Sequence, residues 1–239
     1  MEFKILYVYR KKEMGQPTID FVITRFEEDL SWVNQLPKFY NRVLIYNKGS
    51  PAEFNIPDSQ VHIVPNYGMD GFVNLTHVIN NYDTLADITF FSLGSAWARN
   101  DKRVMFVGTL HFLMKTGGSS IINVVPPSLI KETYDFTLDT WAVSNPENFA
   151  KNPETSLVPS DIRPLGAWFA TYFPGEHITC VSHLGIFAAT STSIRKRPVE
   201  FYKTLLEQVL FKNTEVAHYL ERVWKNVFSI DDACVYSPF

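Results

Sequence analysis

The sequence lacks the features that mark several large protein classes. It has 2 cysteines in 239 residues, too few for a disulfide scaffold, and this low count slightly favours a reducing compartment. No apolar run approaches the roughly 20 residues of a membrane-spanning helix. Residues 1–10 show no short apolar core followed by a small-residue cleavage site, so no signal peptide is expected. These absences together predict a cytoplasmic protein with no membrane span.

The chain also lacks an excess of positive charge. It carries 22 Lys and Arg against 25 Asp and Glu, a net charge of −3, which argues against nucleic-acid binding because that depends on a basic surface. Basic residues gather only in short segments at 10–12, 99–103 and 195–197. Such local clusters suit a small anionic ligand better than a polymer.

Familiar catalytic motifs are missing as well. There is no GxxxxGK[ST], no glycine-rich turn after the early strands, no GxSxG and no HExxH. The sequence therefore argues against a P-loop enzyme, a Rossmann dehydrogenase, an α/β-hydrolase and a zinc protease of the HExxH type.

What the sequence contains is a set of short apolar runs separated by helical patterns. Strands are predicted at 3–9, 20–25, 42–46, 61–65, 87–93, 120–125 and 179–190, and helices at 27–36, 72–82, 102–115, from Pro198 onward and at 215–228. Several strands are continuously apolar, as expected when helices cover both faces of a sheet. The alternation predicts one α/β domain over residues 1–239 with a mostly parallel sheet. A stretch rich in Pro, Asn, Ser and Thr at 126–160 is predicted to be an irregular insertion over one edge.

Polar residues follow the predicted strands where a ligand site is expected. Thr24 and Arg25 end the first core strand, and Asn47 and Lys48 end the second. In open α/β sheets, ligands bind outside the carboxyl ends of the strands. A nucleotide diphosphate would suit such an edge.

Several segments together resemble one known domain family. They are TRFEEDLSW (24–32), IYNKG (45–49), PNYG (65–68), NNYDTLAD (80–87), GIFA (185–188) and HYLERVW (218–224), and the resemblance covers residues 20–228. The family is of uncharacterised function, with members in fungi, bacteria and large DNA viruses of algae. It is similar in layout to GT-A nucleotide-sugar glycosyltransferases, which implies a three-layer sandwich with a mostly parallel central sheet.

This resemblance implies an activity and partners. The chain would move a sugar from a nucleotide diphosphate donor, with a UDP-sugar expected, to a hydroxyl of a glycan or glycoprotein acceptor. The algal-virus members suggest a xylosyltransferase acting on a capsid glycan, in which case the protein would work in the host cytoplasm.

The chain departs from the GT-A pattern at the usual metal site. Most such enzymes have Asp-x-Asp after the fourth core strand, but residues 91–95 read Phe-Ser-Leu-Gly-Ser. No metal is therefore required at that position, although Mn or Mg could be held elsewhere. Our hypothesis is that basic side chains, either Arg99, Lys102 and Arg103 or the 195–197 cluster, stabilise the leaving diphosphate instead.

The donor site is expected to combine strand-end residues with these basic clusters. The expected donor-binding residues are Thr24, Arg25, Asn47, Lys48, Asn66, Gly68, Asp70, Arg99, Arg195 and Arg197.

An inverting transfer needs a carboxylate base, and inversion is favoured because no nucleophile for a covalent intermediate stands out. Glu215 lies in the first turn of the last predicted helix, where the helix dipole would keep it ionised, with His218 one turn on. Glu221 is an alternative base, or a structural partner of an arginine. The expected acceptor-binding residues are Asp139, Trp141 and Trp168, although core burial is favoured for at least two of Trp141, Trp168 and Phe169.

Two other functions stay open. The chain could be a non-catalytic carbohydrate-binding or partner-binding module that has kept the fold, or a nucleotide-sugar hydrolase. Transfer of a sugar to a defined acceptor would separate an enzyme from a module.

Overall fold

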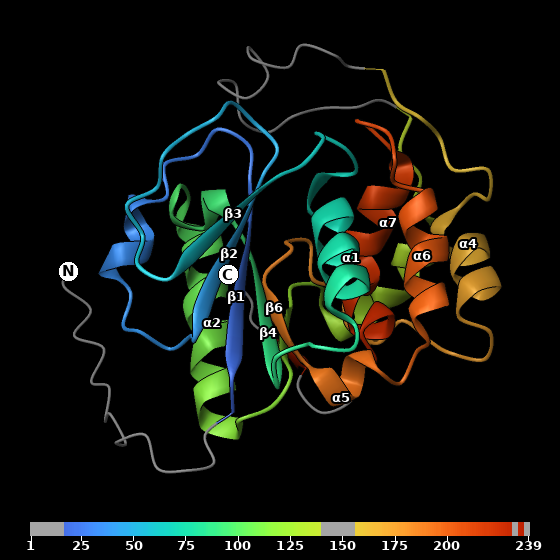
Figure 1. The fold of residues 1–239 in the computed structure, drawn as a ribbon. Coiled ribbons are helices and arrows are strands. Elements are labelled where there is room, and N and C mark those ends of the chain that lie inside the picture. The colour runs from blue at the N-terminus through green and yellow to red at the C-terminus, as the bar shows by residue number, and fades with distance from the viewer. Residues whose placement is uncertain (1–16, 140–155, 231–233, 237–239) are drawn as a thin grey trace.

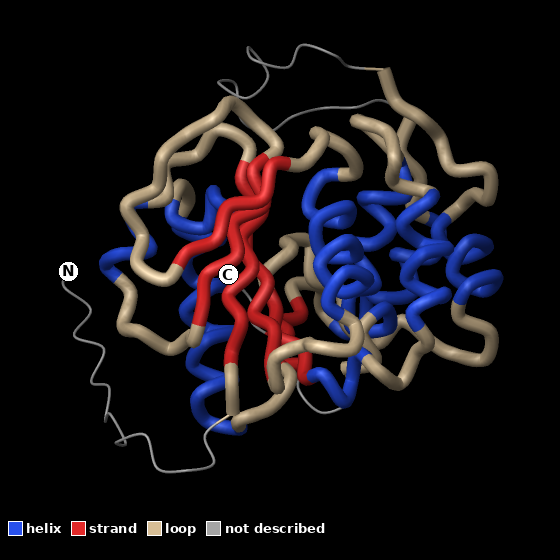
Figure 2. The backbone as a smooth tube through the Cα atoms, in the orientation of Figure 1, coloured by secondary structure: helices blue, strands red, loops and turns tan. Residues whose placement is uncertain are grey.

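A seven-stranded sheet forms the centre of the molecule (Figures 1 and 2). The structure, a computed structural model, describes residues 17–139, 156–230 and 234–236. The strands are β1 (Ile19–Arg25), β2 (Arg42–Asn47), β3 (Ser59–Ile63), β4 (Ile88–Leu93), β5 (Ser120–Asn123), β6 (Phe187–Thr190) and β7 (Cys234–Tyr236), in the order β3-β2-β1-β4-β6-β5-β7. All run parallel except β6, which pairs antiparallel with β4 and with β5.

Helices cover both faces of this sheet. They are α1 (Met69–Asn81), α2 (Asn100–Thr116), α4 (Leu165–Tyr172), α5 (Ser191–Ile194), α6 (Val199–Glu207) and α7 (Glu215–Val227), with 3-10 segments at Ser31–Gln35, Gly94–Trp97 and Pro127–Asp135. Figure 1 shows α2 on one side of the sheet and α1, α4, α6 and α7 on the other. The fold is thus the three-layer α/β sandwich that the sequence predicts.

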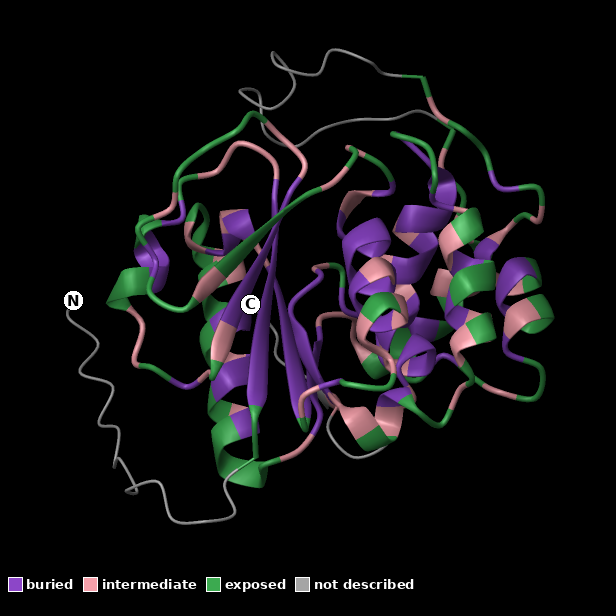
Figure 3. Cartoon of the chain, viewed as in Figure 1, coloured by how far each residue is buried: buried purple, intermediate pink, exposed green. Residues whose placement is uncertain are grey.

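Two apolar cores account for the layers. Successive residues of a strand point to opposite faces, so Val22 of β1 joins the core under α1, α6 and α7, while Phe21 and Ile23 join the core under α2. All seven residues of β1 are buried, which explains its continuous apolar sequence. By contrast, β3 lies at the sheet edge and is largely exposed (Figure 3).

Local sequence sets where the long helices begin and end. The Thr214 hydroxyl accepts a hydrogen bond from the backbone of Val216 and caps α7. Gly117 ends α2 in the left-handed conformation, at φ 68°, which glycine adopts without steric cost. The first turn of α1 follows Gly68, which is also left-handed, at φ 44°.

Most predicted elements are present, but two predictions need correction. The predicted helix at 27–36 is only a 3-10 segment over Ser31–Gln35, and the predicted long strand at 179–190 is a strand only over Phe187–Thr190. Helices α4 and α5 and strand β7 were not predicted from the sequence. The predicted strand at 3–9 lies outside the described residues.

The expected insertion at 126–160 is partly described. It opens with the 3-10 segment Pro127–Asp135. Further on, Val158 bridges to Thr214, just before α7. The insertion therefore reaches the start of α7.

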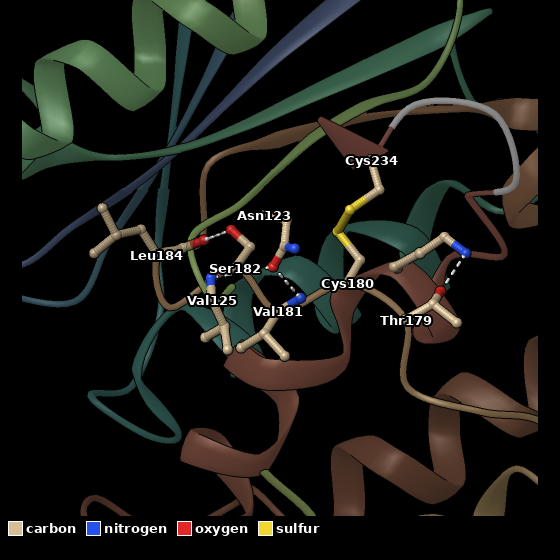
Figure 4. The surroundings of a disulfide bond; sticks show 9 residues. Asn123, Val125, Thr179, Cys180, Val181, Ser182, Leu184 and Cys234 are labelled. Atoms are coloured by element: carbon tan, nitrogen blue, oxygen red, sulfur yellow. Dashed lines mark hydrogen bonds between the residues drawn. A yellow bond between two sulfur atoms is a disulfide. The ribbon is translucent and has the colours of Figure 1, made fainter. Parts of the chain in front are cut away.

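The two cysteines form a disulfide bond, although their low number slightly favoured a reducing compartment. Cys180 and Cys234 join the segment before β6 to β7 (Figure 4). Beside the bond, the side chain of Asn123 accepts hydrogen bonds from the backbone of Val125 and Val181. The cysteine count therefore no longer argues for a reducing compartment or for the cytoplasm. Within the described part of the chain, no helix has both the length and the apolar character needed to cross a bilayer.

Candidate functional site

The carboxyl ends of β1, β2 and β4 meet at one edge of the sheet. Arg25 lies beside Asn47 in the register of β1 and β2, and Thr24 lies beside Leu93 in that of β1 and β4. The sequence predicted that the polar residues ending β1 and β2 would meet here, and they do. We call this edge the rim.

Arg25 organises the loops of the rim and is 5% exposed. Its guanidinium donates to the side-chain oxygen of Asn47 at 2.7 Å and to the backbone oxygens of Ser50 at 3.0 Å and Glu28 at 3.1 Å, and it stacks over Phe54. These contacts hold the side chains of Arg25 and Asn47 in place, and the two residues stabilise the loops that follow β1 and β2. The buried hydroxyl oxygen of Thr24 makes no hydrogen bond to any described residue.

Lys48 connects the end of β2 to the start of α1. Its ammonium group donates to the backbone oxygens of Tyr67 at 2.7 Å and Met69 at 2.6 Å. Burial lowers the pKa of Lys48 to about 8, although the carboxyl groups of Asp70 and Glu28 oppose that change. Lys48 is thus a half-buried cation at the rim.

Asp70 lies in the first turn of α1 and is 4% exposed. Its Oδ2 has no hydrogen-bond partner among the described residues, and it packs against Gly185, where an added Cβ would lie only 1.9 Å from that oxygen. Burial raises the pKa of Asp70 to about 7, and the charge of Glu221 adds to the rise, while Lys48 and Lys102 oppose it. Near neutral pH, this carboxyl is therefore partly protonated.

Lys102 reaches the rim from α2, at the place where Asp-x-Asp was expected. Its ammonium donates to the hydroxyl of Ser95 at 2.8 Å. Burial and the charge of Arg99 lower the pKa of Lys102, and the nearby carboxyls, Glu28 first, oppose this. Glu28 itself accepts a backbone hydrogen bond from Phe26 at 2.7 Å.

Glu221 completes the group from α7, with 13% of its side chain exposed. Its Oε2 lies 3.5 Å from Nδ1 of His218. Arg222 donates to the backbone oxygen of His218 and sits over the ring of Phe136 at 3.5 Å. Burial lowers the pKa of the neighbouring His183, and the charge of Arg222 adds to that effect.

Five residues thus interact electrostatically at the rim. We call Glu28, Lys48, Asp70, Lys102 and Glu221 the rim cluster. Among these, Glu28 was not predicted from the sequence, and neither was His183 next to the cluster. Nothing in the local sequence marks Glu28, because its role depends on the approach of α1 and α2 to β1.

Glu215 lies away from the rim cluster, contrary to its predicted place in the catalytic site. It is completely buried and accepts hydrogen bonds from the backbone of Leu138 at 2.8 Å and of Ser160 at 2.9 Å. Arg163 forms an ion pair with it at 3.0 Å. Both carboxylate oxygens are occupied, so Glu215 anchors the insertion to α7 and is not placed to accept a proton from a substrate.

Arg195 and Arg197 lie at the opposite edge of the sheet from the rim. Because β6 runs antiparallel, its last residue, Thr190, pairs with Ile88, the first residue of β4. Arg195 donates to the backbone oxygen of Tyr82. Arg197 binds Glu176 and the backbone of Asn226 and packs over Phe173 and Phe201. Their placement in the donor site is therefore wrong.

Three other residues predicted to bind the donor are Arg99, Gly68 and Asn66. Arg99 is exposed and paired with Asp101. The backbone amide of Gly68 donates to Phe211, and a Cβ at Gly68 would lie 2.6 Å from Val209, so this glycine allows close packing. Asn66 is half-buried and precedes α1.

The predicted acceptor residues do not meet at the rim. Trp168 is fully buried in the core, and its indole nitrogen donates to Gln208 at 2.7 Å. Asp139 is exposed and paired with Arg163 at 3.0 Å. Trp141 lies outside the described residues.

Metal-ligating side chains are sparse at the rim. Within residues 17–139, 156–230 and 234–236, no three or more His, Cys, Asp or Glu side chains are arranged to hold a metal ion. Asp70 and Glu221 interact electrostatically, but two carboxylates alone do not complete a site. We therefore derive no step through a metal.

Comparison with known proteins gives the family of the chain. No match is found among the curated proteins. The pattern described as "Protein of unknown function (DUF3431)" matches residues 21–238, which include the whole rim cluster. The chain therefore belongs to the DUF3431 family.

Proposed function

We propose that this protein is a glycosyltransferase that binds the diphosphate of a nucleotide-sugar donor at the rim. The observation that supports this most is the meeting of Lys48 and Lys102, from different elements, beside one buried carboxyl: both ammonium groups act on Asp70. A diphosphate leaving group needs positive charge where its own charge develops. The first turn of α1, with its backbone amides, lies at the same place and favours an anion further.

The protonation of Asp70 makes the rim more favourable for a phosphate. An ionised carboxylate beside the diphosphate would repel it, but burial raises the pKa of Asp70 to about 7. An approaching phosphate would raise that pKa further, because like charges disfavour ionisation. Asp70 would then offer a hydroxyl donor where a second carboxylate would otherwise oppose binding.

Glu221 is the proposed base. It is partly exposed, and its Oε2 lies 3.5 Å from the imidazole of His218, which orients it. In the reaction, the acceptor oxygen forms a bond to the anomeric carbon, the bond from that carbon to the phosphate oxygen breaks, and Glu221 takes the acceptor proton. The electron pair of the broken bond leaves with the diphosphate near Lys48 and Lys102. Inversion and a UDP-sugar donor are part of this proposal.

A thermal-shift screen of nucleotide sugars tests donor binding. A donor at a hundred times its dissociation constant would raise the melting temperature by roughly 5–10 °C for a chain of this size. We expect this shift in the wild type and in Lys115→Ala, which removes an exposed lysine of the same helix, but not in Lys102→Ala. EDTA should leave the shift unchanged if the lysines carry out the role of a metal.

A transfer assay tests Glu221 as the base. Glu221→Gln should retain donor binding and lose transfer to a glycan acceptor. The proposal fails if no nucleotide sugar shifts the melting temperature, or if Lys102→Ala binds the donor as the wild type does. Donor binding without transfer to any acceptor would favour the non-catalytic module.

A further inference from the structure

A groove lies on the α1 side of the sheet, between that helix and strands β2 and β3. Its volume is about 540 Å³, within the usual range for small-ligand sites of about 300–1,000 Å³. It extends from Arg42, which begins β2, to Val64, just beyond β3, and Asn80 and Asn81 border it from the last turn of α1.

The groove is separate from the rim cluster. Asp70 lies in the first turn of α1, whereas Asn80 and Asn81 lie in its last turn. At 1.5 Å per residue, the two ends of the helix are about 15 Å apart. A ligand at the end of the groove bordered by Asn80 and Asn81 would therefore not touch Lys48 or Lys102.

The charged groups of the groove are neutralised. Arg42 forms two hydrogen bonds to the carboxylate of Asp20, at 2.6 and 2.7 Å. Behind the groove, burial lowers the pKa of His77 to about 3, so this imidazole is neutral. An anion would find no unpaired guanidinium here, and the lining suits an uncharged polar ligand.

Several groups of the groove are held in place. The ring of His62 stacks on that of Tyr46, with centroids 4.9 Å apart and planes at 23°. The hydroxyl of Tyr46 lies 3.1 Å from Nδ1 of His77. The side-chain nitrogen of Asn81 donates to the backbone oxygen of His77 at 2.8 Å. Preorganised groups of this kind reduce the entropy lost on binding.

Other polar groups in the groove have no protein partner. Gln60 and Asn80 are exposed, and their side chains form no hydrogen bond within the described part of the chain. The buried hydroxyl of Thr76 likewise has no partner among those residues. An amide both donates and accepts, as a sugar hydroxyl does, and an exposed ring face can cover the apolar face of a sugar.

We propose that this groove binds a neutral oligosaccharide. Held there, a glycan would be kept close to the rim and its effective concentration would rise. That the glycan is the acceptor of the transfer reaction rests on the proposed function, whereas binding of the saccharide does not.

Binding of uncharged oligosaccharides to the full-length protein tests this inference. We would measure saturation-transfer NMR and titration calorimetry with tetrasaccharides of xylose, glucose, mannose and galactose. The matched variants are His62→Ala and His111→Ala, which removes an exposed histidine from α2 on the other side of the sheet. We expect at least one tetrasaccharide to bind, His62→Ala to weaken it about tenfold, and His111→Ala to have no effect.

The outcomes separate this inference from the proposed function. Lys102→Ala should bind the saccharide as the wild type does, so saccharide binding without donor binding would leave the groove proposal intact and reject the glycosyltransferase. The groove proposal is overturned if no tetrasaccharide binds, or if His62→Ala and Asn80→Ala both bind as the wild type does. Binding of an extended peptide along the edge strand β3, with no binding of any tetrasaccharide, would also overturn it.

Discussion

The contact between Asp70 and Gly185 gives the sharpest test of the rim geometry. In Gly185→Ala, the new Cβ would lie 1.9 Å from Oδ2 and 2.7 Å from Cγ of Asp70, both well inside contact distance. Asp70 is 4% exposed, so its carboxyl cannot turn into solvent without moving its neighbours. Overpacking of this kind costs about 1–3 kcal/mol, which corresponds to roughly 2–12 °C in melting temperature for a chain of this length.

A double-mutant cycle assigns that cost to this one contact. Asp70→Ala removes the two clashing atoms and leaves only its Cβ, 3.2 Å from where the carbon of the new methyl group would lie. Gly185→Ala should therefore cost little in the Asp70→Ala background, with a coupling free energy of about 1–2 kcal/mol. Urea unfolding of the four proteins measures it.

A matched glycine serves as the control for this cycle. Gly118 has no neighbour closer than 3.9 Å to an added Cβ and is not left-handed. Gly118→Ala should thus change the free energy of unfolding by no more than about 0.5 kcal/mol. If the substitutions at positions 70 and 185 prove additive, the packing of Asp70 against Gly185 is wrong.

Three further predictions concern buried groups. Glu215→Gln should lower the free energy of unfolding by about 1–3 kcal/mol, because the amide keeps only one of the two buried oxygens that accept from the backbone of Leu138 and Ser160; a variant of wild-type stability in urea would contradict the structural role of this residue. The raised pKa of Asp70, about 7, means that its protonated carboxyl contributes stability that is complete below about pH 4 and is lost as the pH rises through 7. Asp70→Asn should therefore show a flatter stability curve between pH 4 and 7, by up to about 1.4 kcal/mol per pH unit, and equal slopes would refute the assignment. The bond between Cys180 and Cys234 closes a 54-residue separation, so Cys234→Ser should cost about 4 kcal/mol in the chain-entropy picture, and the wild-type urea midpoint should fall on adding reductant; an unchanged midpoint would show that the bond is absent in solution.

The sequence predicts the layers of the fold because burial leaves a direct trace in composition. β1, β2 and β4 are covered on both faces, and each is a continuous apolar run. Where those strands end, the polar residues of the rim follow at once, so their meeting could be predicted. The direction of a strand leaves no such trace. β6 is as apolar as its neighbours, so its antiparallel direction could not be predicted. That direction places Arg195 and Arg197 at the opposite edge of the sheet from the rim.

The candidate site could be predicted only where one segment defines it. The helical pattern of α7 places Glu215 and Glu221 correctly on that helix, but it does not reveal what covers each one. Leu138, Ser160 and Arg163 enclose Glu215, and all three come from segments far earlier in the chain. The pairing of the two cysteines is hidden for the same reason, since it depends on how the C-terminal strand returns to the sheet.

The disulfide also links the rim to the far end of the polypeptide. Cys180 lies shortly before Gly185, the residue against which the Asp70 carboxyl rests, and its partner belongs to the last strand. Removal of β7 would therefore release Cys180 and loosen the segment that carries Gly185. For anyone engineering this chain, Cys234 and the strand that carries it are therefore best left unchanged.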